Sequence, residues 1–344
     1  MPRTAATEQI EDVLPEPTGQ LRTDAEVLAL IQHLANMPNS RSLPYLGRAL
    51  ACLAKAPSFR PSTTDAALQA LSEVLQKRVS CSPVSAGLAE AAVPALSSLM
   101  QSTSCPAGLL GAFAAFALSK LPEIQIALAK AALPAVITLL QDTRRPAGQS
   151  LAAMSLSSAA LNARARAPIA RAVLPSLVAM LPAGNLFGMP AFIMQVREAA
   201  LSVLSGLTLD GHHCGAVADL TLPALVSIIE QDKRPGSDCR QRAACVLQHL
   251  TASGSSLVEL EVADAALSGL VQLMQTTSDR QERLVAVTAV SSLAASSDVK
   301  VQGQVYDVAH TALMLQMQQR TDSESRRAAK QALDRLQPSC CVVM

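Results

Sequence analysis

One short phrase interrupts the pattern of apolar and polar positions at fairly regular intervals along the chain. It consists of an apolar residue, a proline, a small residue and the apolar start of a new segment, as in Leu133-Pro134-Ala135-Val136. Further copies begin at Leu43, Val93, Leu174 and Leu222, and a degenerate copy without proline begins at Leu267. The prolines follow one another at intervals of 50, 40, 41 and 48 residues. Self-similarity at about 40–47 residues is typical of solenoids with two or three helices per repeat.

The proline has a physical role in this phrase. The first N–H groups of a helix have no partner within the helix, so a proline costs little there and its fixed φ suits a helix start. Its ring also disfavours helical geometry in the residue before it. Each copy is therefore expected to form a short helix, a sharp corner and a second helix such as Pro134–Gln141.

A third segment follows each phrase, and in it Ala or another small residue precedes a Leu or Val. Small side chains suit helices packed closely side by side, and Ala and Leu are strong helix formers. The expected third helices are Gly111–Leu121, Gln149–Leu161, Val196–Leu207, Gln241–Leu250, Leu284–Ala294 and Arg327–Leu336. Their expected core residues are Leu118, Leu156, Leu204, Leu247, Val290 and Leu333, with Leu71 in the first full repeat. The last three intervals between these core residues are 43 residues each.

The three-segment order and its proline phrase resemble the armadillo family, whose repeats run as a short helix, a second helix opening near a proline and a long third helix. The resemblance covers residues 20–337 and implies an all-α, right-handed superhelical solenoid of about six to seven repeats, each packed only against its neighbours. HEAT repeats remain an alternative for residues 1–90, where the spacing is loosest. Residues 1–19 are expected to be a disordered lead-in and residues 338–344 a flexible tail.

The composition fits this fold and narrows the function. Half of the residues are hydrophobic, but only 2% are aromatic and none is Trp, so Ala, Leu and Val must fill the core. There are 28 Lys and Arg against 27 Asp and Glu, and this balance argues against nucleic acid as a partner, because counterion release requires a basic excess. No phosphate loop, nucleophile elbow or zinc-protease spacing occurs, so we predict no enzyme activity, cofactor or small-molecule substrate.

The cysteines and the N-terminus indicate the cellular compartment. Eight cysteines in 344 residues do not have the density of a disulfide scaffold. The N-terminus lacks the apolar core of a secretory signal, and Pro2 stands where N-myristoylation requires Gly. Charged and polar residues interrupt every long apolar stretch, so no transmembrane helix is predicted. These features predict a protein of the reducing cytoplasm, and the resemblance to armadillo repeats implies a eukaryotic source.

One group of histidines and cysteines has the ligand types that zinc prefers. Its members are His212, His213, Cys214, Cys239, Cys245 and His249. They include no CxxC or CxxH pair, and Cys245 falls on the small-residue face of an expected third helix, where Cys behaves as a small hydrophobe. No metal site is therefore predicted.

The family resemblance also implies where a partner binds. In armadillo proteins the third helices line a concave groove, and the implied ladder lies two residues after each core residue, with a second set four residues earlier. From these positions the candidate groove residues are Glu73, Phe116, Lys120, Met154, Ser158, His249, Ser292 and Arg335.

This ladder differs from those of two known groups in the family. Nuclear-import carriers have Asn on the ladder with Trp four residues earlier, and this chain has neither at any of those positions. Catenin-like grooves are strongly basic, whereas Lys120 and Arg335 are the only cations of this ladder. The resemblance therefore implies a protein partner without identifying it, and a generic polar, solvated face is the alternative.

Residues 182–192 lengthen one repeat with a segment rich in Gly and Pro. Phe187, Met189 and Phe192 make it a candidate partner loop, because clustered apolar side chains often mark partner sites. A loop that folds back over a repeat junction is an equal alternative.

The last four residues, Cys341-Val342-Val343-Met344, match the Cys-aliphatic-aliphatic-X signal for prenylation, with Met favouring farnesyl. One lipid chain gives only marginal membrane binding, so a second signal is expected. Cys340 is a candidate for palmitoylation, and anionic lipid could attract the basic residues Arg326, Arg327, Lys330 and Arg335. The alternative is a chance tail on a soluble protein.

Taken together, these features predict a non-enzymatic scaffold or adaptor that binds protein partners in its groove and is peripheral on the cytosolic face of a membrane. Two alternatives stay open. The first is a soluble armadillo subunit of a large assembly such as a ciliary axoneme, and the second is a regulator of small GTPases.

Overall fold

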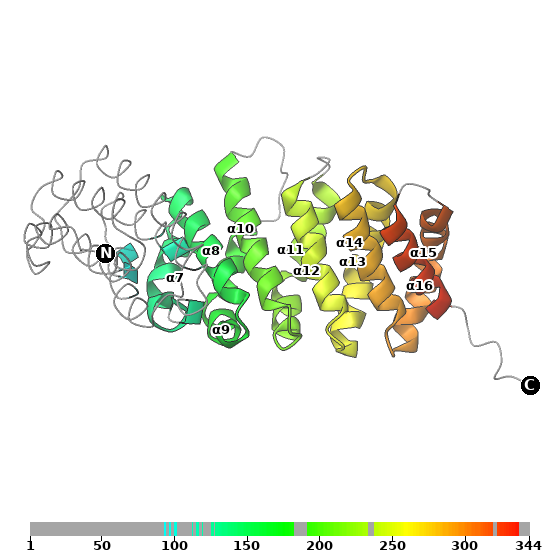
Figure 1. Ribbon diagram of the computed structural model, residues 1–344, viewed down its shortest axis with the longest axis horizontal. Coiled ribbons are helices and arrows are strands. Elements are labelled where there is room, and N and C mark those ends of the chain that lie inside the picture. Colours follow the sequence, from blue (N-terminus) through cyan, green and yellow to red (C-terminus); the bar gives the residue numbers. More distant parts are fainter. Residues whose placement is uncertain are drawn as a thin grey trace, which may run out of the picture. The chain divides into compact units, whose positions relative to one another are not determined.

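The computed structural model describes residues 128–181, 191–232, 237–318 and 322–336, with Phe192 through its backbone alone, and a few single residues between 93 and 126. The chain divides into two compact units, residues 1–165 and 166–344, and each is described on its own. All regular structure in the described segments is helical, as Figure 1 shows, so the predicted all-α fold class is confirmed.

The described helices of the first unit follow the predicted order. A π-helical turn, η1 (Leu128–Ala132), leads into α7 (Leu133–Gln141), which packs against α8 (Pro146–Ala160). Pro134 lies in the first turn of α7, as its missing N–H requires. The next helix, α9 (Ala163–Ala179), begins at the boundary between the units.

The second unit contains two layers of helices. They are formed by α10 (Ala191–Leu207), α11 (Cys214–Gln231), α12 (Asp238–Thr251), α13 (Ser256–Thr276), α14 (Arg280–Ala294), α15 (Val299–Gln318) and α16 (Ser323–Leu336).

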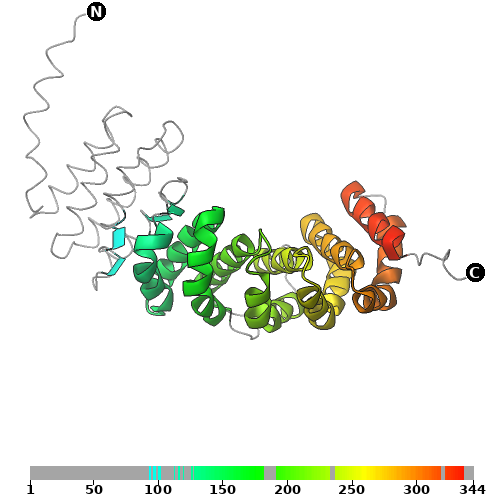
Figure 2. The same cartoon turned by 90° about the horizontal axis from the view of Figure 1, so that it is seen from below.

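We call α10, α12, α14 and α16 the third-helix layer and α11, α13 and α15 the long-helix layer. Within each layer every helix packs against the next one, and α11–α12, α13–α14 and α15–α16 form antiparallel pairs between the layers (Figure 2). This arrangement, in which each repeat contacts only its neighbours, is that of a helical solenoid.

The core residues predicted from the repeat spacing are buried. Leu204, Leu247 and Val290 have no exposed surface, and Leu156 and Leu333 are 2% and 7% exposed. The predictions for Leu71 and Leu118 fall outside the described residues. The third-helix positions are therefore confirmed from α8 to α16.

The predicted corner at the proline is wrong in the second unit. Pro175 lies inside α9 and Pro223 inside α11, while the degenerate phrase at Leu267 lies within α13. A proline removes one backbone hydrogen bond and bends a helix, but α9 and α11 both continue through their prolines. Leu222 and Leu225 are 7% and 0% exposed, so packing holds α11 together across Pro223.

Among the described helices, α11 has the length and apolar composition of a membrane span. It packs against α12 and α13, and it buries polar Thr221 together with Val217 and Leu225. A helix that is covered by other helices of its own repeat array fits a core helix of the solenoid.

Candidate functional site

Three candidate groove residues lie on neighbouring helices of the third-helix layer. His249 is on α12, Ser292 on α14 and Arg335 on α16, and these helices pack against one another in that order. His249 and Ser292 are half-buried and Arg335 is exposed. The repeat register thus brings the three side chains to one layer.

The other predicted site residues belong to the first unit or lie outside the described segments. Met154 and Ser158 are one turn apart on α8, with Met154 37% exposed. Phe116 is half-buried, and its carbonyl accepts a hydrogen bond from Ser119. Glu73, Lys120, Phe187 and Met189, as well as the lipidation candidates Cys340 and Cys341, lie outside the described residues. Phe192 lies in the first turn of α10, so this helix begins before the expected end of the insertion.

Hydroxyl groups on the third-helix layer are bonded to their own helices. Ser202 Oγ donates to the Glu198 carbonyl at 2.8 Å, and Thr288 Oγ1 donates to the Leu284 carbonyl at 2.7 Å. Ser292 Oγ donates to the carbonyl of Thr288 at 3.1 Å. Because their hydrogens are used in this way, these residues present hydrogen-bond acceptors and small apolar surfaces to a ligand, without charge.

The side chain of His249 contacts residues of the neighbouring repeat. Its Nδ1 lies 3.1 Å from Thr208 Oγ1 and 3.2 Å from the Ser205 carbonyl oxygen. Burial lowers the pKa of His249, and the carbonyl of Ser205 offsets this only in part, so the ring is uncharged at neutral pH. The ring borders a pocket of about 270 Å³ between the ends of α10 and α12.

The cysteines near this pocket do not form a reactive site. Burial, with the Asp210 carboxylate nearby, raises the pKa of Cys214 to about 11. Burial also raises the pKa of Cys245, and the Cys239 thiol donates to the Met194 carbonyl. Protonated thiols are poor nucleophiles and poor metal ligands. In residues 128–181, 191–232, 237–318 and 322–336, no three His, Cys, Asp or Glu side chains are placed to hold a metal ion.

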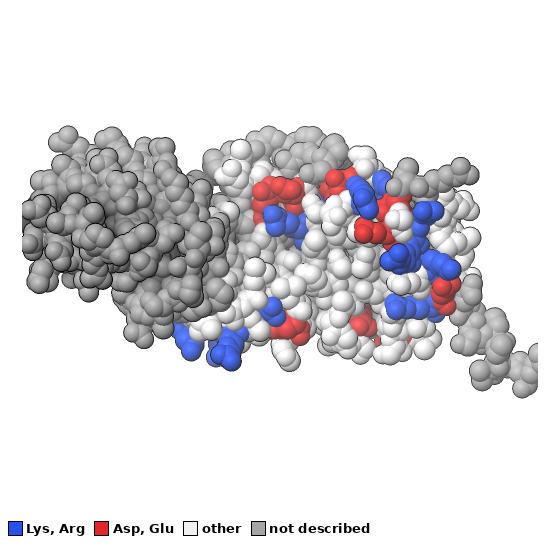
Figure 3. Space-filling model, viewed as in Figure 1, with Lys and Arg blue, Asp and Glu red and all other residues white. Residues whose placement is uncertain are grey.

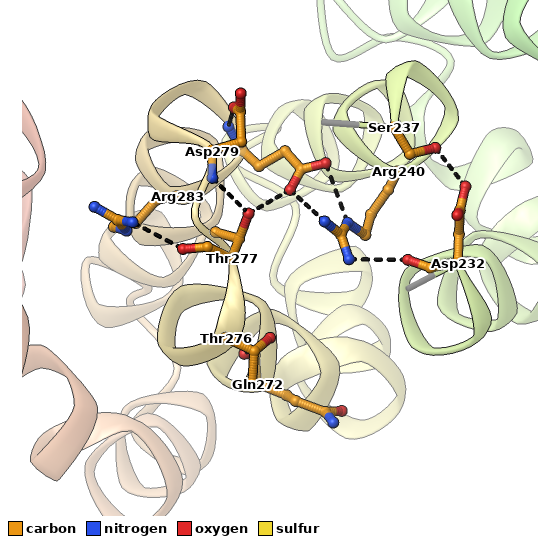
Figure 4. A network of polar contacts seen from close by, with 9 residues as sticks. Asp232, Ser237, Arg240, Gln272, Thr276, Thr277, Asp279 and Arg283 are labelled. Carbon is orange, nitrogen blue, oxygen red and sulfur yellow. Dashed lines mark hydrogen bonds and ion pairs between the residues drawn. The ribbon is translucent and has the colours of Figure 1, made fainter. Parts of the chain in front are cut away.

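A buried ion pair links two helices of the third-helix layer, as Figure 4 shows. Arg240 of α12 binds Glu282 of α14 through both carboxylate oxygens, with Nη2–Oε2 at 2.6 Å and Nε–Oε1 at 3.1 Å. Arg240 Nη1 also donates to the Asp232 carbonyl, at the end of α11, at 2.9 Å. Thr277 Oγ1 donates to Glu282, so the carboxylate is fully surrounded by donors.

Arg240 belongs to a repeated set that our sequence analysis missed. Arg197, Arg240, Arg283 and Arg326 follow one another at intervals of 43 residues, each seven residues before a core Leu or Val. Like Arg240, Arg283 donates to the carbonyl of the residue that directly follows the preceding long helix, that of Thr277 after α13, at 2.8 Å. A cation at this end of a helix binds the carbonyls that have no partner within it. The signal was present in the sequence as a second 43-residue periodicity.

The charge of the third-helix layer changes toward the C-terminus. Figure 3 shows Lys and Arg side chains gathered, with some acidic ones among them, over α14 and α16. Arg280 binds Glu324 at 2.9 Å, and Arg335 Nη1 donates to the Ser291 carbonyl at 3.4 Å. Arg327 and Lys330 are exposed. The ladder positions are thus uncharged from α10 to α14 and cationic at α16.

Comparison with known proteins identifies the fold. No family model and no curated protein matches the chain. A designed armadillo repeat protein matches with a TM-score of 0.62 at 17% identity, covering 71% of this chain and 99% of its own. A second one, solved in complex with the peptide (KR)4, gives a TM-score of 0.63 at 17% identity with the same coverage. An engineered protein with a TM-score of 0.63 and 21% identity covers 90% of this chain and 78% of its own. The fold is that of armadillo-repeat solenoids.

Proposed function

We propose that this protein is a non-enzymatic scaffold that holds an extended segment of a partner protein along the third-helix layer. The observation that carries the proposal is the alignment of His249, Ser292 and Arg335 on three successive packed helices. Side chains that recur at one position per repeat match the regular spacing of an extended peptide. The peptide bound by the designed armadillo protein supports the same use of this fold.

The chemistry of the ladder favours a particular kind of partner segment. The ladder residues on α10, α12 and α14 carry no carboxylate, and the hydroxyl oxygens of Thr288 and Ser292 on α14 can accept hydrogen bonds from the backbone N–H groups of a peptide. A peptide of Lys and Arg would find no counter-charge there and would meet Arg335 on α16. We therefore expect the partner segment to be uncharged over α12 and α14 and acidic over α16.

A display selection tests the binding face. Peptides selected from a displayed random library on the full-length protein should lose at least tenfold in affinity with Thr288→Arg, measured by fluorescence anisotropy. Thr276→Arg is the matched control, since Thr276 on α13 also donates its hydroxyl to its own helix, at 2.8 Å, but belongs to the long-helix layer.

Two outcomes would contradict this proposal. The first is equal loss of affinity in Thr288→Arg and Thr276→Arg, which would place the peptide elsewhere. The second is tight binding of (KR)4 itself, because an uncharged ladder ending in Arg335 offers that peptide no electrostatic attraction.

We further propose that the scaffold is attached to the cytosolic face of a membrane by a prenyl group on Cys341. The tetrapeptide Cys341-Val342-Val343-Met344 supports this assignment, and exposed Arg327 and Lys330 on α16 precede Cys341 by 14 and 11 residues. Intact mass spectrometry of the protein from its native cells is the direct test. A chain that ends in unmodified Met344 would remove the anchor and leave the soluble assembly subunit as the better interpretation.

A further inference from the structure

Equivalent positions of α13 and α15 lie 43 residues apart, so the outer side of α15 can be compared with the side of α13 that another repeat covers. On α13, Ala263, Leu267, Val271 and Met274 are buried, at 5%, 3%, 8% and 1% exposure, because α15 packs against this helix. The residues 43 positions later are Tyr306, His310, Met314 and Met317. These α15 side chains occupy the places where a further repeat would pack.

This side of α15 is apolar and open to solvent in the described part of the chain. Tyr306 and Met314 are 47% and 37% exposed, and His310 and Met317 are half-buried. The last repeat of a solenoid normally carries polar residues on its outer side. On α16 this holds, since Lys330 occupies the place of buried Val287 on α14. On α15 it does not, which indicates that something covers this side.

The exposed side of α15 has the spacing of a helix-pairing seam. Val299, Gly303, Tyr306, His310, Met314 and Met317 recur at intervals of three and four residues, and we call this set the α15 end face. Val299 is 80% exposed. A Cβ atom added at Gly303 would have no neighbour within 4 Å, so the space beside this residue is open.

The α15 end face is complementary to the same face of a second α15 helix that runs in the opposite direction. In an antiparallel pair of α15 helices centred near residue 308, Val299 lies opposite Met317, Gly303 opposite Met314 and Tyr306 opposite His310. The open space at Gly303 would then accommodate the long Met314 side chain. The rings of Tyr306 and His310, which lie 4.9 Å apart and tilted by 40° within one chain, would meet their counterparts. A surface that matches its own reverse is the requirement for a two-fold symmetric contact.

We propose that two copies of this chain associate end to end, with α15 packed antiparallel against α15 of the second copy. A second copy is the occupant that these residues specify, because each large side chain of the end face has a small or flat counterpart on the same face. The flanking charges on α16, Lys330 and Asp334, are of opposite sign, so two copies brought together in this way do not carry like charge alone. The proposal is independent of the lipid anchor.

The test is the mass of the full-length protein in solution, by light scattering and sedimentation equilibrium. Wild type should have twice the chain mass of 35.9 kDa. Gly303→Glu and Tyr306→Glu should have the single chain mass, because each places a charge in the seam. Val308→Glu is the matched control, since Val308 is also exposed (46%) but points to the other side of α15, and it should stay dimeric.

Gly303→Glu should also fold normally, so a loss of the dimer in this variant could not be explained by misfolding. Nothing lies within 4 Å of the added side chain, and replacing Gly within a helix favours helix formation, so this variant should unfold no earlier than wild type. A monomeric wild type at the highest soluble concentration would overturn the proposal, as would a dimer that both Glu variants leave intact. A wild-type monomer that dimerises only after removal of residues 337–344 would show instead that the chain's own tail covers the end face.

Discussion

At the scale of single residues, the buried ion pair of Arg240 and Glu282 couples α11, α12 and α14. Its side chains are 8% and 0% exposed, and every oxygen of the carboxylate has a donor. Removal of one partner leaves the other charge buried without compensation, so Glu282→Ala should lower the free energy of unfolding by ~3–5 kcal/mol. Chemical denaturation measures this loss.

Two further variants test whether the loss comes from an uncompensated buried charge or from the loss of any ion pair. Replacement of both residues, Arg240→Met with Glu282→Leu, should cost far less than the two single changes added together. Glu324→Ala removes the exposed pair with Arg280, 58% and 64% exposed, but leaves Arg280 beside Asp322, and it should cost less than about 1 kcal/mol. Equal losses for the buried and the exposed pair would show that the Arg240 network is not coupled as described.

Asp322 caps the first turn of α16 and links stability to pH. Burial raises the pKa of this carboxyl, but hydrogen bonds from Ser325 and the Glu324 N–H, together with the Arg280 charge, outweigh it and lower the pKa below its ordinary value of 3.8. A lowered folded-state pKa stabilises the protein above the unfolded-state value, and this contribution is lost as the pH falls below about 4.

Asp322→Asn should therefore be less stable than wild type at neutral pH, and the difference should shrink as the pH falls below about 4. Asn keeps the oxygen that accepts from the backbone N–H groups, but it removes the charge together with Oδ2, the acceptor of the Ser325 hydroxyl. Ser325→Ala, which removes the hydroxyl that donates to Asp322 at 2.5 Å, should reproduce part of the effect. Denaturation curves from pH 3 to pH 7 provide the comparison, and a difference that is independent of pH would contradict the assignment.

The core residues could be predicted from the sequence, because an apolar residue preceded by small ones recurs at a regular interval. Leu204, Leu247 and Val290 were placed in the core because apolar residues recur with small ones before them, and they are fully buried. Arg240 and Arg283 recur with the same period but were overlooked, because a charged residue is expected on the surface. Only the structure shows that their guanidinium groups bind the end of the preceding helix.

At the scale of helices, the prolines of the repeated phrase act in two different ways. Pro134 begins α7, where it replaces an N–H that has no partner, whereas Pro223 interrupts the hydrogen bonds within α11. Pro134→Ala should therefore change the free energy of unfolding by less than about 1 kcal/mol. Pro223→Ala should stabilise the protein by ~1–3 kcal/mol, because the ring is exposed and its removal restores a helical hydrogen bond without opening a cavity.

Thermal and chemical denaturation of both variants decide between these roles. A loss of stability in Pro223→Ala would mean that the bend at this proline is needed for α11 to pack on both α12 and α13. The two prolines share the same local phrase, so local sequence could not separate them. The burial of the flanking residues does not separate them either, since Leu133 and Leu222 are both 7% exposed. What differs is that a π-helical turn precedes Pro134, whereas α-helix lies on both sides of Pro223.

At the scale of the whole molecule, the repeat architecture could be predicted from spacing, since each repeat contacts only its neighbours. The layer that carries the ladder was implied by the resemblance to armadillo repeats. The partner could not be predicted in the same way. The hydroxyls of Thr288 and Ser292 look like hydrogen-bond donors in the sequence, but the structure uses their hydrogens within α14. The chemistry offered to a ligand therefore depends on the rotamer of each side chain as well as on its identity.

The lipid anchor and the proposed dimer make one joint prediction about membrane binding. A single prenyl chain binds a membrane weakly and reversibly, whereas a dimer carries two Cys341 residues, and linked anchors reinforce one another. Cys341→Ser should move the protein from membrane to soluble fractions with an unchanged circular dichroism spectrum. Serine cannot replace the thiolate as nucleophile, because its hydroxyl is not ionised near neutral pH.

Two milder changes should give smaller shifts than Cys341→Ser in the same fractionation. Cys340→Ser keeps the prenyl group but removes the site proposed for a second lipid, and Gly303→Glu keeps both cysteines but separates the two copies. Each should leave part of the protein on the membrane, because some of the proposed lipids remain. The Cys340→Ser dimer keeps two prenyl groups, and the Gly303→Glu monomer keeps one prenyl group and the second lipid. If Gly303→Glu were monomeric yet bound as fully as wild type, each chain would hold the membrane by itself through Cys340 and the basic residues of α16. If instead Cys340→Ser released the protein as completely as Cys341→Ser, the two cysteines would act as a single obligatory signal and a second copy could not substitute for either lipid.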